Sequence, residues 1–123
     1  MQSLIDALIL ALIALTIDVP WLMLTQASSS KLIQGIQGSP VSLRFAPAAA
    51  VYLAIGILIS RARSIEDAIL IGAATYAVYD FTNYATLKNY DLTFALTDIV
   101  WGGVLFGLTA LVAKKIGAFR FRS

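Results

Sequence analysis

Three aspartates lie inside the most apolar stretches of this sequence, where a charged side chain is costly. Asp18, Asp80 and Asp98 each interrupt a long run of hydrophobic residues. A carboxylate at the centre of a bilayer opposes insertion by about 2.5–3.5 kcal/mol. Such acids face the interior of a helix bundle or a water-filled cavity, where they bind protons, cations or polar ligands. The chemistry that this sequence offers is therefore that of carboxylates in an apolar setting.

Composition excludes most other kinds of chemistry. The 123 residues are 59% hydrophobic and 13% charged, with no cysteine and no histidine. Soluble domains carry about a quarter charged residues, so the chain is expected to be an integral membrane protein in contact with the lipid bilayer. The missing residue types exclude disulfides and Cys/His metal sites. A net charge of +2, without a basic stripe, argues against nucleic acid as a partner.

Motifs of known enzyme classes are absent from the sequence. There is no P-loop, no G-x-S-x-G, no H-E-x-x-H and no dinucleotide-binding fingerprint. We therefore expect no cofactor and no enzymatic activity, with a carboxylate-based membrane enzyme as a minor alternative. Whether the acids hold a metal ion is left open by the sequence.

Four apolar segments provide the helices that must position the acids. We expect one all-α domain, residues 1–123, folded as a membrane bundle of four helices. By the ~20-residue rule for a membrane span, these helices cover about 4–25, 45–60, 66–87 and 92–113. The first linker contains Gly35, Gly38 and Pro40, which predict a loop or a short interfacial helix. A signal peptide is less favoured at the N-terminus, because the basic n-region is missing.

The basic residues predict how the bundle lies in the membrane. Lys and Arg are more frequent in cytoplasmic loops than in the loops on the other side. One side of the predicted bundle collects Arg61, Arg63, Lys114, Lys115, Arg120 and Arg122, whereas the other collects Lys31, Arg44 and Lys88. Both termini belong to the more basic side, so we expect both to be cytoplasmic.

Counting residues from the ends of the spans places the three acids at one depth. With a rise of about 1.5 Å per residue, Asp18, Asp80 and Asp98 each lie roughly 9–12 Å below the non-cytoplasmic surface. Three different helices are thus predicted to bring carboxylates into one layer. This common depth indicates a shared site for an ion or a ligand.

Helical spacing adds polar neighbours to the acid of the third helix. Tyr76, Asp80 and Asn83 lie on one face of that helix. A second polar stripe follows beside it: Thr75, Tyr79, Thr82 and Thr86. Because more than half of its outer circumference is polar, we expect this helix to lie between other helices.

The other two acids are each followed by a tryptophan. Trp21 lies one turn after Asp18, and Trp101 lies one turn after Asp98. Each indole N–H can order the polar network around the aspartate of its own helix. The predicted binding residues are thus Asp18, Asp80, Asp98, Asn83, Tyr76, Trp21 and Trp101.

Small residues in the fourth helix predict close helix packing. Gly103 and Gly107 form a GxxxG pair, and Gly102 widens the smooth strip. Such a strip lets two helices approach closely. The contact is expected within the bundle or, alternatively, between copies of the chain.

The same acids also have a purely structural interpretation. Basic residues of the same side can reach inward and form ion pairs with them: Lys31, Arg44 and Lys88. Alternatively, the acids are protonated and hydrogen-bonded to neighbouring side chains: Tyr76, Asn83 or Thr97. In either case the acids hold the bundle shut and bind nothing.

The stretch YDFTNYATLK, residues 79–88, resembles the recurring string of a known family. The string is close to Y-D-x-T-N-x-A-x-L-K, and the family comprises small predicted membrane proteins of bacteria and large DNA viruses. Asp98 with Trp101 matches the aspartate and tryptophan that follow in the next span, and Tyr90 stands where the family often has Trp. The resemblance implies about four spans and carries no known activity.

Two functions are compatible with these observations. The first is transport of an ion, a proton or a small polar solute, or a channel-like activity, through the carboxylate cluster. The second is a structural or accessory role in a larger membrane complex or a virion membrane, with no chemistry of its own. A homo-oligomer is compatible with both.

Overall fold

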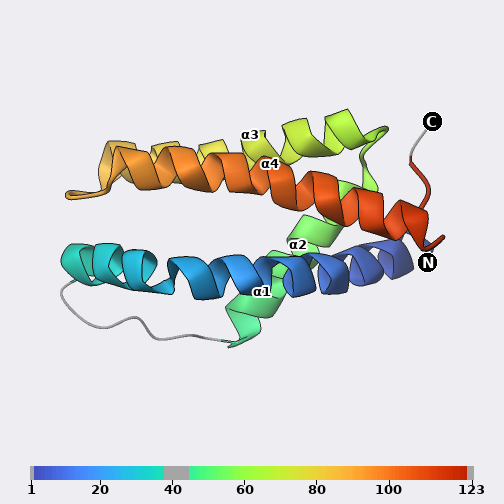
Figure 1. Ribbon diagram of the computed structural model, residues 1–123, viewed down its shortest axis with the longest axis horizontal. Coiled ribbons are helices and arrows are strands. Elements are labelled where there is room, and N and C mark those ends of the chain that lie inside the picture. The colour runs from blue at the N-terminus through green and yellow to red at the C-terminus, as the bar shows by residue number, and fades with distance from the viewer. Residues whose placement is uncertain (1, 38–44, 122–123) are drawn as a thin grey trace.

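The computed structural model describes residues 2–37 and 45–121, and within these ranges the regular structure is entirely α-helical (Figure 1). The helices are α1 (Gln2–Gln37), α2 (Phe45–Ser60), α3 (Ile65–Thr86) and α4 (Leu92–Lys115). The prediction of an all-α chain is therefore confirmed.

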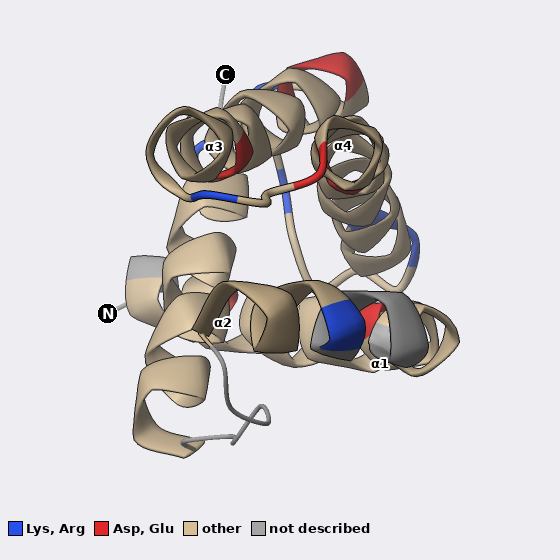
Figure 2. Cartoon of the chain, turned by 90° about the vertical axis from the view of Figure 1, so that its left-hand side faces the viewer, with Lys and Arg blue, Asp and Glu red and all other residues tan. Residues whose placement is uncertain are grey.

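The helices are arranged as two packed pairs. Helix α3 packs along α4, α1 packs against α2, and the contact of α1 with α4 joins the pairs. Figure 1 shows α2 crossing α1 obliquely, with both ends of the chain at the same end of the bundle. Figure 2 shows the α3–α4 pair lying over the α1–α2 pair.

Helix α1 is longer than the sequence predicts. It continues through Gln37, so the separate loop or short interfacial helix expected after residue 25 is wrong for residues 26–37, which extend α1. A single glycine costs a helix only about 1 kcal/mol, and Gly35 is accommodated without ending α1. Gly38 and Pro40 lie outside the described residues.

Two of the helices are long and apolar enough to cross a membrane. These segments are Leu4–Thr25 of α1 and Leu92–Lys115 of α4. Only 28% and 44% of their most apolar windows are buried inside the protein, so most of these side chains face outward. An outward apolar surface suits lipid rather than the core of a soluble protein. Helix α2 is apolar but shorter.

Helix α3 does not lie where its polarity predicts. It packs mainly against α4, and Tyr79, Thr82 and Thr86 are exposed, Tyr79 by 69%. The expectation that α3 lies between other helices is therefore wrong for this stripe. The reason is that α3 turns the neighbouring face, which carries Tyr76 and Asp80, toward α4.

Glycines of α4 allow the close contact with α3. A Cβ atom on Gly102 would overlap the ring of Tyr76, and one on Gly107 would meet Ile69 at 2.6 Å. A Cβ atom on Gly103 would approach Ile69 as well. The glycine strip is therefore buried against α3 of the same chain.

The tightest packing lies toward the end of the bundle that carries the termini. Its core includes Leu10, Ala14, Ile59, Leu105, Phe106 and Ala110. At the opposite end of the bundle Asp91 caps the start of α4. Its carboxylate accepts hydrogen bonds from the backbone N–H groups of Thr93 (3.4 Å) and Phe94 (3.1 Å). This cap fixes the start of α4 and hence the position of Asp98.

Candidate functional site

Asp18 of α1 joins three helices through its two carboxylate oxygens. The Tyr52 hydroxyl of α2 donates to Oδ2 at 2.5 Å, and the Trp101 indole N–H of α4 donates to Oδ1 at 2.8 Å. The Asp18 side chain is only 5% exposed. Both acceptors of a buried carboxylate are thus satisfied by neutral donors.

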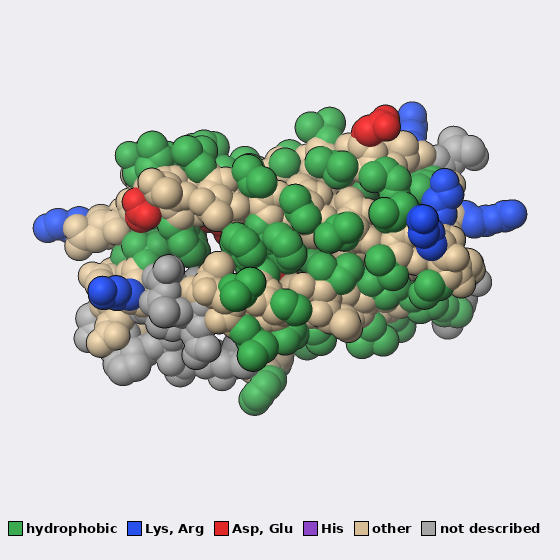
Figure 3. All heavy atoms as spheres, in the orientation of Figure 1, with side chains coloured by type: hydrophobic (Ala, Val, Ile, Leu, Met, Phe, Trp, Pro, Cys, Tyr) green, Lys and Arg blue, Asp and Glu red, His purple; other side chains and the backbone are tan. Residues whose placement is uncertain are grey.

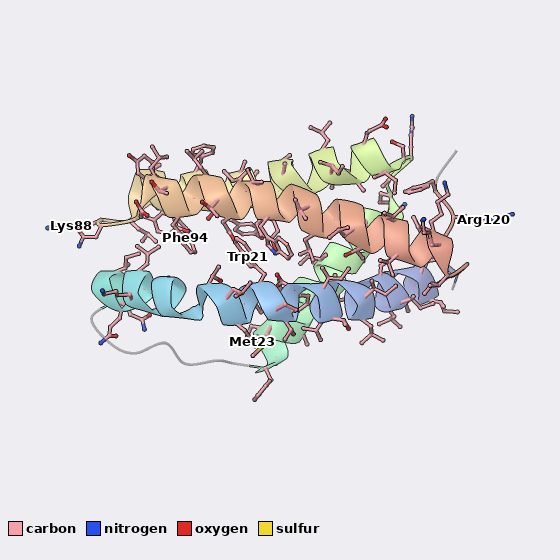
Figure 4. The ribbon with its side chains drawn as sticks, viewed as in Figure 1. Trp21, Met23, Lys88, Phe94 and Arg120 are labelled. Carbon is pink, nitrogen blue, oxygen red and sulfur yellow. The ribbon has the colours of Figure 1, made fainter. Side chains whose placement is uncertain are left out.

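The two tryptophans stack on each other between α1 and α4. Their ring centroids are 4.8 Å apart and the rings are 8° from parallel. In Figure 4 Trp21 lies in the space between the two helices. This stacking turns the indole of Trp101 toward α1, so Trp101 hydrogen-bonds Asp18 rather than Asp98 of its own helix.

Asp80 of α3 is the most buried of the three acids, at 3% exposed. Its Oδ1 accepts a hydrogen bond from the Tyr90 hydroxyl at 2.9 Å. Its Oδ2 is buried and has no hydrogen-bond partner among the described residues. Asp98 of α4 is partly buried, and its carboxylate interacts with Asp80 and, secondarily, with Asp18.

Two further predicted residues belong to this network. Tyr76 interacts electrostatically with all three carboxylates and packs edge-on against Phe106 at 6.3 Å. Asn83 joins the network through Tyr90. The structure therefore brings the seven residues singled out in the sequence into one place, which we call the carboxylate network.

Tyr90 lies in the turn between α3 and α4, and its hydroxyl donates a hydrogen bond to Asp80. Burial raises the pKa of Tyr90 to about 12; the hydrogen bond with Asn83 opposes this rise, and that with Asp80 adds to it. The hydroxyl therefore remains protonated at neutral pH and keeps donating to Asp80.

The ion pairs of the structural interpretation are not formed by the described residues. Lys31 and Lys88 are exposed and have no ion pair with an acid of the network. Figure 4 shows Lys88 pointing away from the helices. Arg44 lies outside the described residues. The Thr97 hydroxyl donates to the backbone carbonyl of Thr93 at 2.9 Å, so it does not donate to an acid of the network.

The most important donors of the network were missed in the sequence. Tyr52 stands in the otherwise apolar second segment, and this isolated hydroxyl is the signal that was available. Tyr90 was noted only as a departure from the family string. In the structure its hydroxyl donates a hydrogen bond to Asp80.

A groove between α1 and α4 reaches the network from the end opposite the termini. Its inner cavity, of about 210 Å³, is lined by Trp21 and Thr25 of α1 and, on the side of α4, by Asp91, Thr93, Phe94, Thr97 and Asp98. We call this space the inner cavity.

An outer cavity of about 400 Å³ adjoins the inner one. Lys31, Leu32, Gly35 and Asn89 line it, and it shares Asp91 and Phe94 with the inner cavity. Figure 3 shows the hollow between α1 and α4, with acidic atoms visible inside it. Asp98 is therefore reachable through the groove, whereas Asp18 and Asp80 are buried behind it.

The described part of the chain contains no group of three acidic side chains arranged to hold a metal ion. The network instead combines carboxylates with phenol and indole donors. This arrangement suits protons, hydrated cations or cationic groups of organic molecules.

The chain was compared with known proteins. Residues 3–114 match the model of a family described as "Predicted membrane protein (DUF2177)". Comparison with curated proteins and with solved structures gave no match. The family match covers nearly the whole chain, including all four helices except the ends of α1 and α4. The chain therefore belongs to the DUF2177 family of predicted membrane proteins.

Proposed function

We propose that this protein moves protons or small cations across a membrane through the carboxylate network. In this proposal all four helices cross the bilayer, α2 obliquely, and both termini are cytoplasmic. The groove between α1 and α4 then opens toward the non-cytoplasmic side. The ends of the chain lie together in Figure 1, which supports the even number of spans.

The observation that carries the proposal is the pair of neighbouring carboxyl groups, Asp80 and Asp98, inside the bundle. Asp80 is almost fully buried and interacts with Asp98, and no basic side chain among the described residues neutralises the pair. Two adjacent carboxylates cannot both remain ionised in an apolar setting without a large electrostatic cost. A proton or a cation at this pair removes that cost.

Asp98 is placed to exchange the bound species. It lines the inner cavity and also interacts with Asp80, so it connects the groove with the buried part of the network. Asp18 and Asp80 each accept a fixed hydrogen bond from a tyrosine. The three acids therefore have different roles: Asp98 exchanges with the groove, and the other two hold the charge inside.

The proposal is tested by flux into liposomes that contain the purified protein. We expect wild-type protein to carry protons or monovalent cations down an imposed gradient, detected by an internal dye. Asp98→Asn and Asp80→Asn keep the side-chain size but cannot take up a proton, so flux is expected to fall to the level of empty liposomes.

Glu66→Gln is the matched control, because Glu66 is exposed at the start of α3, far from the network. Circular dichroism verifies that each variant is folded. The proposal is wrong if wild-type liposomes leak no faster than empty ones, or if Asp98→Asn carries full flux.

The exposed stripe of α3 favours a second candidate function, that of a subunit in a larger membrane assembly. Tyr79, Thr82 and Thr86 would place hydroxyl groups against lipid in a lone chain. Polar side chains of this kind commonly hydrogen-bond across helices in a membrane. A neighbouring helix would therefore cover this stripe.

The mass of the native assembly tests this second function. We expect protein extracted in a mild detergent to have a mass well above the 13.2 kDa of one chain. Replacing Thr82 and Thr86 with valine is expected to reduce that mass by removing the hydroxyls. The same change at Thr16, which is exposed on α1, serves as the control. A stable monomer in mild detergent contradicts the assembly role.

A further inference from the structure

The lining of the inner cavity carries several hydrogen-bond acceptors beside the Trp21 indole and the Thr93 hydroxyl. The Thr25 hydroxyl donates to the Trp21 carbonyl at 2.8 Å, and the Thr97 hydroxyl donates to the Thr93 carbonyl at 2.9 Å. With their protons used in this way, both hydroxyl oxygens offer only lone pairs to the cavity. The Asp98 carboxylate adds further acceptors.

No basic side chain lines the inner cavity within the described part of the chain. Its charged lining consists of Asp91 and Asp98, two turns apart on α4. Asp91 already accepts two backbone hydrogen bonds as the cap of α4, whereas Asp98 lies deeper in the groove. Two carboxylates and the lone pairs of Thr25 and Thr97 therefore favour a positively charged guest that donates hydrogen bonds.

Aromatic rings make up much of the rest of the lining. Trp21 is held by its stacking on Trp101, and Phe94 packs edge-on against Tyr90 at 6.1 Å. Fixed aromatic side chains attract organic cations, and combined with carboxylates they recognise ammonium groups. The volume of about 210 Å³ suits a small headgroup rather than a drug-sized molecule.

We propose that the inner cavity binds the ammonium group of a small amine or of a lipid headgroup. The inference rests on the proposed function in one respect: it names the ammonium ion as the cation that the carboxylate network would carry. Binding of that ion to the cavity can be measured without any flux. A bare metal ion is disfavoured, because the described acids form no metal-holding group and the lining is partly aromatic.

The outer cavity distinguishes the two sources of the ammonium group. Lys31 lines this adjoining space, where the phosphate of a headgroup would lie when its ammonium occupies the inner cavity. A free amine has no anionic part to meet Lys31. The two sources therefore predict different effects of Lys31→Gln.

Tryptophan fluorescence provides a direct binding assay. The chain has two tryptophans, and both stack at the inner cavity, so the whole signal comes from this site. Purified protein in an amine-free detergent is titrated with ethanolamine, with methylammonium and, at equal ionic strength, with potassium chloride. We expect a saturable change with the two ammonium ions and none with potassium.

Two variants link this signal to the cavity. Asp98→Asn removes the negative charge, so we expect the dissociation constant for ammonium ions to rise by about tenfold or more. Thr97→Val removes an acceptor with little change in shape, and its dissociation constant is expected to rise several-fold even if Asp98→Asn fails to fold. Glu66→Gln is expected to bind as wild type does. Unsaturable or potassium-like responses, or unchanged binding in both variants, overturn the inference.

A short-chain phosphatidylethanolamine identifies the source. Binding that is much tighter than that of ethanolamine and is weakened by Lys31→Gln assigns the site to a lipid headgroup. Equal binding of both, without an effect of Lys31→Gln, assigns it to a free amine. A protein that carries protons in liposomes but gives no ammonium signal contradicts this inference alone and leaves the proposed function standing.

Discussion

Replacing Gly102 with alanine is expected to lower the free energy of unfolding by about 1–3 kcal/mol. The added methyl group would overlap the ring of Tyr76 on α3. Tyr76 cannot easily give way, because its ring packs edge-on against Phe106, which is fully buried. The helices must therefore separate, and this moves Tyr76 relative to the carboxylate network.

The same substitution at Gly35 is the matched control. A Cβ atom at Gly35 meets no other atom within 4 Å. Alanine there is expected to stabilise α1 by about 0.5–1 kcal/mol, because glycine loses more conformational freedom in a helix. Denaturant unfolding in detergent, followed by circular dichroism, measures both. Equal effects of the two substitutions would contradict the close α3–α4 contact.

Removing a donor from Asp18 is expected to produce the second large effect. Tyr52→Phe and Trp101→Phe each leave one oxygen of a buried carboxylate without a partner. An unsatisfied buried acceptor costs about 1–3 kcal/mol, and more when the group is charged. Each variant is therefore expected to unfold at a clearly lower denaturant concentration than wild type.

A double-mutant cycle assigns this loss to the hydrogen bonds. In an Asp18→Ala background the further loss on Tyr52→Phe is expected to shrink, giving a coupling energy of about 0.5–3 kcal/mol. Tyr79→Phe removes the same hydroxyl from an exposed tyrosine and is expected to change stability by less than about 0.5 kcal/mol. Additive losses in the cycle would show that Tyr52 and Asp18 act independently.

The grouping of the acids was predictable from the sequence, because the constant rise of a helix let residue counting predict one depth for Asp18, Asp80 and Asp98. In the structure Asp98 interacts with the other two acids, and Tyr76 interacts with all three. The all-α class followed equally directly from the long apolar runs. Helical class and the spacing of the acids depend only on the order of residues along each helix, and that order can be read from a single sequence.

The partners of the acids were not predictable in the same way. Whether Trp101 turns to Asp98 or to Asp18 depends on the rotation of α4 and on its stacking with Trp21, which only packing decides. Tyr52 reaches Asp18 because α2 crosses α1 obliquely, and no helical period encodes a crossing angle.

Helix polarity was also an incomplete guide to position. The polar stripe of α3 at Tyr79 predicted a central helix, but a single chain leaves this stripe exposed. The length of α1 was underestimated because its apolar run ends near residue 25 and because Gly35, Gly38 and Pro40 predicted a loop or a short interfacial helix, although a single glycine only weakens a helix.

The hydrogen bonds of Asp18 have a mechanical consequence. One of its donors, Tyr52, belongs to the same helix pair as Asp18, whereas the other, Trp101, belongs to the α3–α4 pair. The Trp101 bond is thus a direct hydrogen bond between the two helix pairs. A change of charge on the Asp18 carboxylate alters the strength of its hydrogen bond with Trp101. Protonation of Asp18 would therefore also change how firmly the α1–α2 pair is held against the α3–α4 pair.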